Sequence, residues 1–269
     1  MDINKLQLFQ QSGHPSWEEY KAIKNCYGHV ASFGYYPERK KHKPGRNQTL
    51  IADSNDEYEI KLKPHLNKKI VFLGLNTGLR EDERYESRAD GEPITTAKIN
   101  EIVAKNKKIG LFDNQYGSDD SGRYWDLFKG YAASQEPRDT LRQDYNKPNV
   151  FDGAYLTDFL KFERNDSDFK ASGLSTKTGN ELTKLLKIDG LIEHNVKGLQ
   201  HELAILGEPN PTAIVMLGSH FSSRHFDEYI ANAFPNTYVH QISHYKNTTG
   251  RVVQDELYEL NDKLLDLLD

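Results

Sequence analysis

The sequence has very little cysteine and no long apolar run. Cys26 is the single cysteine among 269 residues, which excludes an intrachain disulfide and any multi-cysteine metal or iron–sulfur site. No stretch approaches the roughly 20 apolar residues that a membrane-spanning helix needs. The segment from Met1 to Ser12 lacks the apolar centre of a signal peptide. We therefore expect a cytoplasmic protein that does not contact a membrane.

An excess of positive charge is also missing. The chain has 35 Lys and Arg against 40 Asp and Glu, a formal net charge of -5, so the whole molecule does not attract nucleic acid. Basic residues are nevertheless concentrated in one stretch that contains Arg39, Lys40 and Lys41. Such a stretch is either a solvated loop or a phosphate-binding surface, and binding to phosphates would weaken as salt is raised.

Common enzyme signatures are absent as well. The sequence has no Gly-x-Ser-x-Gly nucleophile turn and no Gly-x-x-x-x-Gly-Lys-Ser/Thr phosphate loop. The pairs His220 with His225 and His240 with His244 have spacings that a zinc site could use, but no cysteine or acidic pattern accompanies them. We expect neither a metal nor another cofactor.

Short apolar runs bounded by turn residues predict four strands, at 70–74, 154–161, 213–217 and 237–242. Helical spacing predicts helices over 1–30, 179–206, 221–234 and 252–268, with Ser16 as a cap inside the first of them. Strands that alternate with helices indicate an α/β fold with a mainly parallel, four-stranded central sheet. We expect residues 1–64 to form an N-terminal extension of helices and loops, and 65–269 the α/β domain, in one compact unit.

The most informative segment is the run at 70–78, which ends in Gly74-Leu75-Asn76-Thr77-Gly78. A run of β-branched and aromatic residues before glycine is typical of a buried parallel strand. Open α/β sheets bind their ligands beyond the carboxyl ends of such strands. Asn76 is therefore the first candidate for chemistry, although asparagine also serves as a turn residue that tolerates unusual backbone angles.

Polar residues stand at the ends of two further predicted strands, Asp158 at the second and His244 after the fourth. The carboxyl ends of parallel strands lie at one edge of a sheet, so these residues and Asn76 can meet in one pocket. Five segments in this order resemble motifs of the uracil-DNA glycosylase superfamily, and 74–78 is most similar to the Gly-x-Asn-Pro-Gly turn of its mismatch-specific branch. The others are 122–125, 154–161, 214–218 and 243–247.

The resemblance covers roughly residues 65–268 and implies a three-layer α/β/α sandwich. It also implies an enzyme that flips a nucleotide out of DNA, single-stranded or mismatched, and cleaves the N-glycosidic bond of uracil or another deaminated or damaged base. Asn76 would hold the attacking water, and His244 would donate a hydrogen bond to the leaving base. Base-binding residues would be Gly74, Leu75, Asp158, Phe112 and Tyr116. DNA-contacting residues would be Lys246, Asn247, Arg39, Lys40 and Lys41.

Several alternatives remain open at this point. Asp158 stands where uracil-reading members carry Asn, and an ionised carboxylate can only accept hydrogen bonds. Asp158 is therefore protonated, turned away from the base or paired with a basic group such as Lys161, or the substrate is not uracil. His240 is a rival to His244. A protein of the same fold that only binds nucleic acid or a base, and a nucleotide hydrolase with 79–121 as a lid, are the other functional hypotheses.

Overall fold

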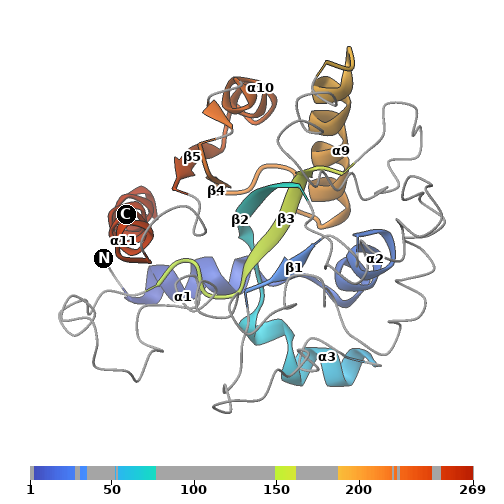
Figure 1. The fold of residues 1–269 in the computed structure, drawn as a ribbon. Helices are drawn as coiled ribbons and strands as arrows, with labels where there is room; N and C mark the ends of the chain where they lie inside the picture. The colour runs from blue at the N-terminus through green and yellow to red at the C-terminus, as the bar shows by residue number, and fades with distance from the viewer. Residues whose placement is uncertain are drawn as a thin grey trace.

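The described residues form a five-stranded sheet in the order β1-β3-β2-β4-β5 (Figure 1). This computed structural model describes residues 3–27, 31–34, 52, 54–76, 149–161, 187–219, 221–222, 225–243 and 250–268. Four strands run parallel: β2 (Asn67–Asn76), β3 (Ala154–Leu160), β4 (Ala213–Leu217) and β5 (Tyr238–Ile242). The predicted mainly parallel sheet is therefore confirmed. A short strand that was not predicted, β1 (Ser32–Phe33), pairs antiparallel with β3.

The described helices differ from the predicted ones mainly at their starts. The helix expected over 1–30 is divided into α1 (Ile3–Ser12) and α2 (Trp17–Tyr27). The helix expected over 221–234 begins later, because His225 has a left-handed φ of 60° and precedes the first helical turn. The remaining helices are α3 (Asn55–Lys61), the short 3-10 turn η2 (Lys63–His65), α9 (Leu191–Ile205), α10 (Phe226–Ala233) and α11 (Gly250–Leu268).

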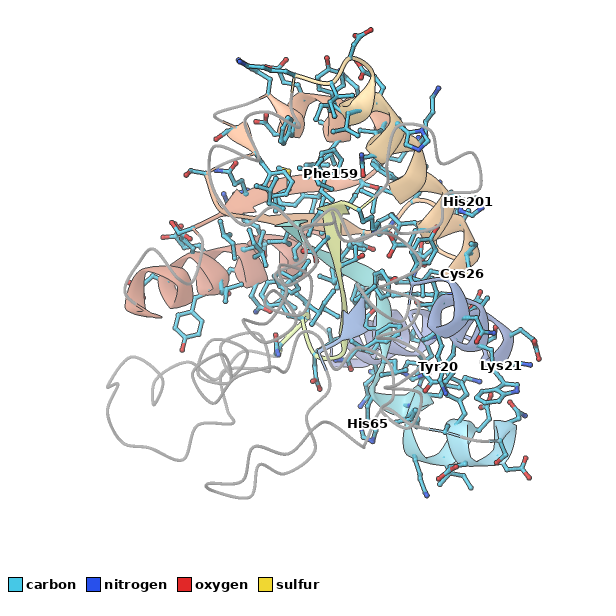
Figure 2. All side chains as sticks on the ribbon, turned by 45° about the vertical axis from the view of Figure 1, so that its right-hand side comes forward. Tyr20, Lys21, Cys26, His65, Phe159 and His201 are labelled. Carbon is cyan, nitrogen blue, oxygen red and sulfur yellow. The ribbon has the colours of Figure 1, made fainter. Side chains whose placement is uncertain are left out.

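The sheet is covered by helices on both faces, which gives the three layers. Alternation along β2 sends Val71 and Leu73 to one face and Ile70 and Phe72 to the other. The first face packs against α2, α3, α9 and α10, and Phe159 of β3 lies in this interior (Figure 2). The second face packs against α1 and α11 (Figure 1). Both layers of helices bury apolar side chains against one sheet, so the α/β/α sandwich is confirmed.

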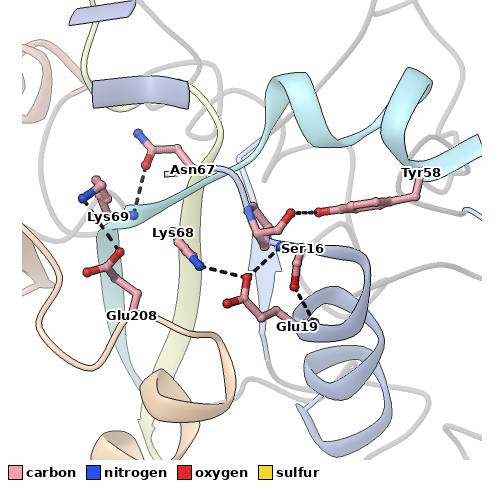
Figure 3. A network of polar contacts seen from close by, with 8 residues as sticks. Ser16, Glu19, Tyr58, Asn67, Lys68, Lys69 and Glu208 are labelled. Carbon is pink, nitrogen blue, oxygen red and sulfur yellow. Dashed lines mark hydrogen bonds and ion pairs between the residues drawn. The ribbon is translucent and has the colours of Figure 1, made fainter. Parts of the chain in front are cut away.

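At the amino-terminal edge of the sheet, the carboxylate of Glu19 links the start of α2 to β2 (Figure 3). This carboxylate accepts the Ser16 N–H at 2.6 Å, and Ser16 Oγ accepts the Glu19 N–H at 3.2 Å. The reciprocal pair is a capping box that starts α2. Glu19 also pairs at 2.8 Å with the ammonium group of Lys68, near the start of β2. The hydroxyl of Tyr58 in α3 donates to the Pro15 carbonyl at 2.5 Å, so α3 is also linked to the start of α2.

Replacement of Gly207 by alanine is expected to weaken this edge. Gly207 follows α9 with a φ of +72°, and a Cβ there would overlap the Glu19 carboxylate. The left-handed backbone alone costs a residue with a side chain about 1–2 kcal/mol, and Glu19 would also be displaced from Lys68. Urea unfolding should therefore give a free energy of unfolding lower by at least that amount. Lys197→Ala, on the exposed side of α9, is the control, and an equal effect of the two variants would contradict this explanation.

Candidate site at the carboxyl edge of the sheet

The carboxyl ends of the parallel strands define the candidate site. Asn76 is the last residue of β2, which lies between β3 and β4, and it is in register with Leu160 of β3. On the other side of β4, β5 ends at Ile242 and continues to Ser243. Adjacent strands lie about 4.8 Å apart, so the ends of β2 and β5 are separated by about 10 Å along the edge. The sheet order thus brings the ends of three sequence-distant segments to one place.

The side chain of Asp158 lies over the neighbouring strand at this edge. Asp158 is in register with Gly74 of β2 and is 8% exposed. A Cβ built on Gly74 would overlap the Asp158 Oδ1. Glycine is therefore required at 74 for the carboxylate to occupy this space. Two of the predicted base-binding positions, Gly74 and Asp158, are in direct proximity.

Leu75 faces the opposite side of β2 from Gly74. Its half-buried side chain packs against the core formed with α2 and α9. The backbone of Leu75 thus belongs to the edge, whereas its side chain contributes to the interior.

A fully buried ion pair between Lys161 and Glu202 lies directly behind this edge. Lys161 follows β3, and its ammonium group contacts the Glu202 carboxylate of α9 and donates to Thr157 Oγ1 at 2.7 Å. Glu202 Oε1 also accepts the hydroxyl groups of Tyr155, at 2.7 Å, and Thr157, at 2.8 Å. Both members of the pair are 0% exposed. The network fixes the carboxyl end of β3 against α9.

The backbone and charges around Lys161 complete this network. The Lys161 N–H donates to Asn195 Oδ1 at 2.9 Å, and its ammonium group lies 5.5 Å from the centre of the Tyr27 ring. Burial lowers the pKa of Lys161, while the charges of Glu202 and Asp158 act to raise it. Burial and the neighbouring Glu202 raise the pKa of Tyr155 well above its ordinary value. The hydroxyl of Tyr155 therefore remains a hydrogen-bond donor to Glu202.

Sequence reasoning missed this pair, although one signal was available. Glu202 occupies the apolar stripe of its helix together with Leu199 and Leu203, all of them buried. A charged residue at such a position requires a buried partner. Lys161 is an even number of residues from Tyr155 and Thr157, so its side chain is expected on the same face of β3, and that face contacts α9. The alternation along β3 and the buried stripe of α9 together indicate a pair between Lys161 and Glu202.

The end of β5 is held by Glu256 of α11. The Glu256 carboxylate accepts both the Ser243 N–H, at 2.6 Å, and the Ser243 hydroxyl, at 2.7 Å. His240 lies inside β5, in register with Val215 of β4, and stacks on Tyr238 with ring centres 5.8 Å apart. Burial and the charge of Lys263 lower the pKa of His240. The side chain of His240 is thus engaged within the strand, two residues before its end.

The remaining predicted site residues lie outside the described residues. They are His244, Phe112, Tyr116, Lys246, Asn247, Arg39, Lys40 and Lys41, and Asn76 is placed by its backbone. Within the described ranges, no cluster of three or more His, Cys, Asp or Glu side chains is arranged to hold a metal ion. Within the same ranges, no helix has both the length and the apolar character needed to cross a bilayer.

Comparison of the chain with protein-family models, curated proteins and solved structures finds no match.

Proposed function

We propose that this chain is a DNA glycosylase-like hydrolase that cleaves the N-glycosidic bond of uracil or another deaminated or damaged base. The observation that carries the proposal is the position of Asn76 at the end of β2, on the edge where β3 presents Asp158. β5 leads to the same edge at Ser243, and His244 is the next residue in the sequence. The resemblance of these segments to the glycosylase motifs is the second support.

The chemistry assigns a different task to each group. A flipped nucleotide would enter with its sugar toward the end of β2 and its base across the edge. Water attacks C1′ of the sugar while the C1′–N bond breaks and its electron pair goes to the base; the sugar keeps the hydroxyl group, and the proton that the water loses ends on the released base through solvent. The Asn76 amide is too weakly basic to take the proton early, so its contribution is to position the water. His244 would donate a hydrogen bond to the base oxygen on which negative charge develops.

The separation of the ends of β2 and β5 suits two groups that act on opposite sides of the sugar and its base. The ends of β2 and β5 are two strand spacings apart, about 10 Å. A water-positioning group and a base-stabilising group must stand on opposite sides of a sugar and its base. Two groups on adjacent strands, about 4.8 Å apart, would leave little room for both.

The test is a cleavage assay with enzyme in excess over labelled oligonucleotides. Single- and double-stranded forms would carry uracil, a T/G mismatch, hypoxanthine, xanthine or an oxidised guanine, followed by alkaline scission of abasic sites. The proposal expects scission of at least one substrate and release of the intact free base. Duplex binding without abasic product on any substrate would instead favour the binding-protein hypothesis. Hydrolysis of monomeric nucleotides alone would favour the nucleotide hydrolase.

Replacement of Gly74 by alanine should reduce this cleavage without unfolding the protein. The new Cβ would overlap the Asp158 carboxylate, which is the end of a side chain and can move. We expect at least a tenfold lower single-turnover rate, because misplacement by about 1 Å in a site is costly. The melting temperature should change less than in Gly207→Ala. A wild-type rate in Gly74→Ala would show that cleavage does not depend on the position of the Asp158 carboxylate over Gly74.

A further inference from the structure

The end of β5 is held at three consecutive residues, by two different parts of the chain. The side-chain oxygen of Gln241 accepts the Ser222 N–H at 3.0 Å. The carbonyl of Ile242 accepts the Gly218 N–H at 2.8 Å. The third residue, Ser243, is bound by a carboxylate of α11. The strand is thus fixed on the side of β4 and on the side of α11, up to its last described residue.

The carboxylate of Glu256 holds Ser243 with both of its oxygens. One oxygen accepts the backbone N–H at 2.6 Å, and the other accepts the hydroxyl at 2.7 Å. Hydrogen bonds to a charged acceptor are short and strong. The register of β5 with β4 ends at Ile242, so Ser243 lies beyond the strand ladder. Glu256 itself is anchored, because the next residue, Leu257, and Leu260 are buried in the core that also contains Ile242 (Figure 1).

We infer that Glu256 is a positioning residue for His244: it holds Ser243, and through Ser243 it sets where the chain enters position 244. The inference rests on the proposed function and deepens it, since it names a residue of α11 on which the leaving-base step depends. Consecutive Cα atoms are about 3.8 Å apart, so a fixed Ser243 restricts the place of the next residue. Misplacement of a reacting group by about 1 Å can cost about 100-fold in rate.

The charge of Glu256 is a separate effect that the test must distinguish from its hydrogen bonds. Burial and the charge of Lys263 lower the pKa of His240, while Glu256 and Glu259 act to raise it. Both glutamates therefore act electrostatically on the end of β5. Glu259 is exposed on the same helix, whereas the two bonds to Ser243 come from Glu256. Glu259→Ala is thus the matched control for the loss of charge.

The first arm of the test measures amide hydrogen exchange by NMR and needs no substrate. In Glu256→Ala the amides of Ser243 and His244 should exchange at least tenfold faster than in the wild type, because the strand end opens more easily. In Glu259→Ala they should stay within about twofold of the wild type. Unchanged exchange in folded Glu256→Ala, or an equal rise in the two variants, would overturn the inference. Should Glu256→Ala not fold, Glu256→Gln replaces it, since its one amide oxygen cannot accept both donors.

The second arm asks whether the effect of Glu256 on cleavage passes through His244. Glu256→Ala should lower the single-turnover rate by about 10- to 100-fold. In the His244→Ala background the same change should cost no more than about twofold, because residues that act as a unit are not additive. Ser243→Thr, which keeps the hydroxyl, should retain more of the rate than Ser243→Ala.

An equal loss in the presence and absence of His244 would overturn the positioning role, because a merely structural contribution of Glu256 would lower both rates alike. If the wild-type protein cleaves no substrate, the proposed function fails, and the exchange measurement alone decides whether Glu256 holds this part of the chain.

Discussion

Replacement of Lys161 by methionine is expected to lower the free energy of unfolding by about 3–5 kcal/mol. The Lys161 ammonium and the Glu202 carboxylate are both 0% exposed. Removal of one partner leaves the other charge in the interior without compensation, and Glu202 would have to take up a proton to remain there. Urea unfolding at neutral pH measures the loss.

A double-mutant cycle with Lys161→Met and Glu202→Gln isolates the interaction between these two residues from their contacts with the rest of the protein. Lys161→Met with Glu202→Gln removes both charges of the pair, and the Gln amide oxygen can still accept the hydroxyl groups of Tyr155 and Thr157. The double variant should therefore be more stable than the less stable of the single variants, which gives a positive coupling in a double-mutant cycle. Lys61→Met is the matched control, because Lys61 pairs with Glu57 at the surface with its side chain 64% exposed. Exposed pairs contribute about 0–1 kcal/mol, and a comparable loss in Lys61→Met would contradict the account.

Replacement of Asn76 by alanine, or of His244 by alanine, should lower the single-turnover cleavage rate by about 10²–10³-fold. This is the magnitude typical of removing one group that stabilises the transition state. The free energy of unfolding of each variant is measured beside the rate, so that a loss of cleavage in a folded protein is distinguished from unfolding. The rate is measured with enzyme in excess, on whichever oligonucleotide the wild type cleaves.

His240→Ala is the informative control for this prediction. His240 stacks on Tyr238 inside β5, so its loss should leave the cleavage rate within tenfold of the wild type. A large loss in His240→Ala together with an unchanged rate in His244→Ala would assign the leaving-base role to the rival histidine. An unchanged rate in Asn76→Ala would contradict the proposed role of Asn76 in positioning the water.

The sheet could be predicted from the sequence because its strands are short apolar runs bounded by turns. The run around Val71 and the run around Val215 are both buried on both faces, and such strands give a continuous signal. The two-residue β1 was not predictable, since its partner in β3 is more than a hundred residues away. The late start of α10 depends on the left-handed backbone of His225, and the residues around His225 do not predict this conformation.

The candidate site was predicted to the extent that it follows from strand ends. Asn76 and Asp158 were expected at one edge, and the register of β2 with β3 brings their strands together there. The space over Gly74 depends on the three-dimensional pairing of Gly74 with Asp158, so composition and spacing did not reveal it. The Lys161–Glu202 pair joins residues 41 apart in sequence, and each looks like an ordinary surface charge until the helical stripe around Glu202 is considered.

The most direct test of the account is the release of free base from one oligonucleotide by wild-type protein and by Asn76→Ala, prepared side by side. The abasic strand and the liberated base would be measured in the same reaction by mass spectrometry, with enzyme in excess. The account predicts equal amounts of both products from the wild type and a loss of at least 100-fold in the variant, by analogy with removal of one such group. Equal release by the two proteins, or strand binding with no base released by either, would contradict a hydrolytic site at the carboxyl edge of this sheet.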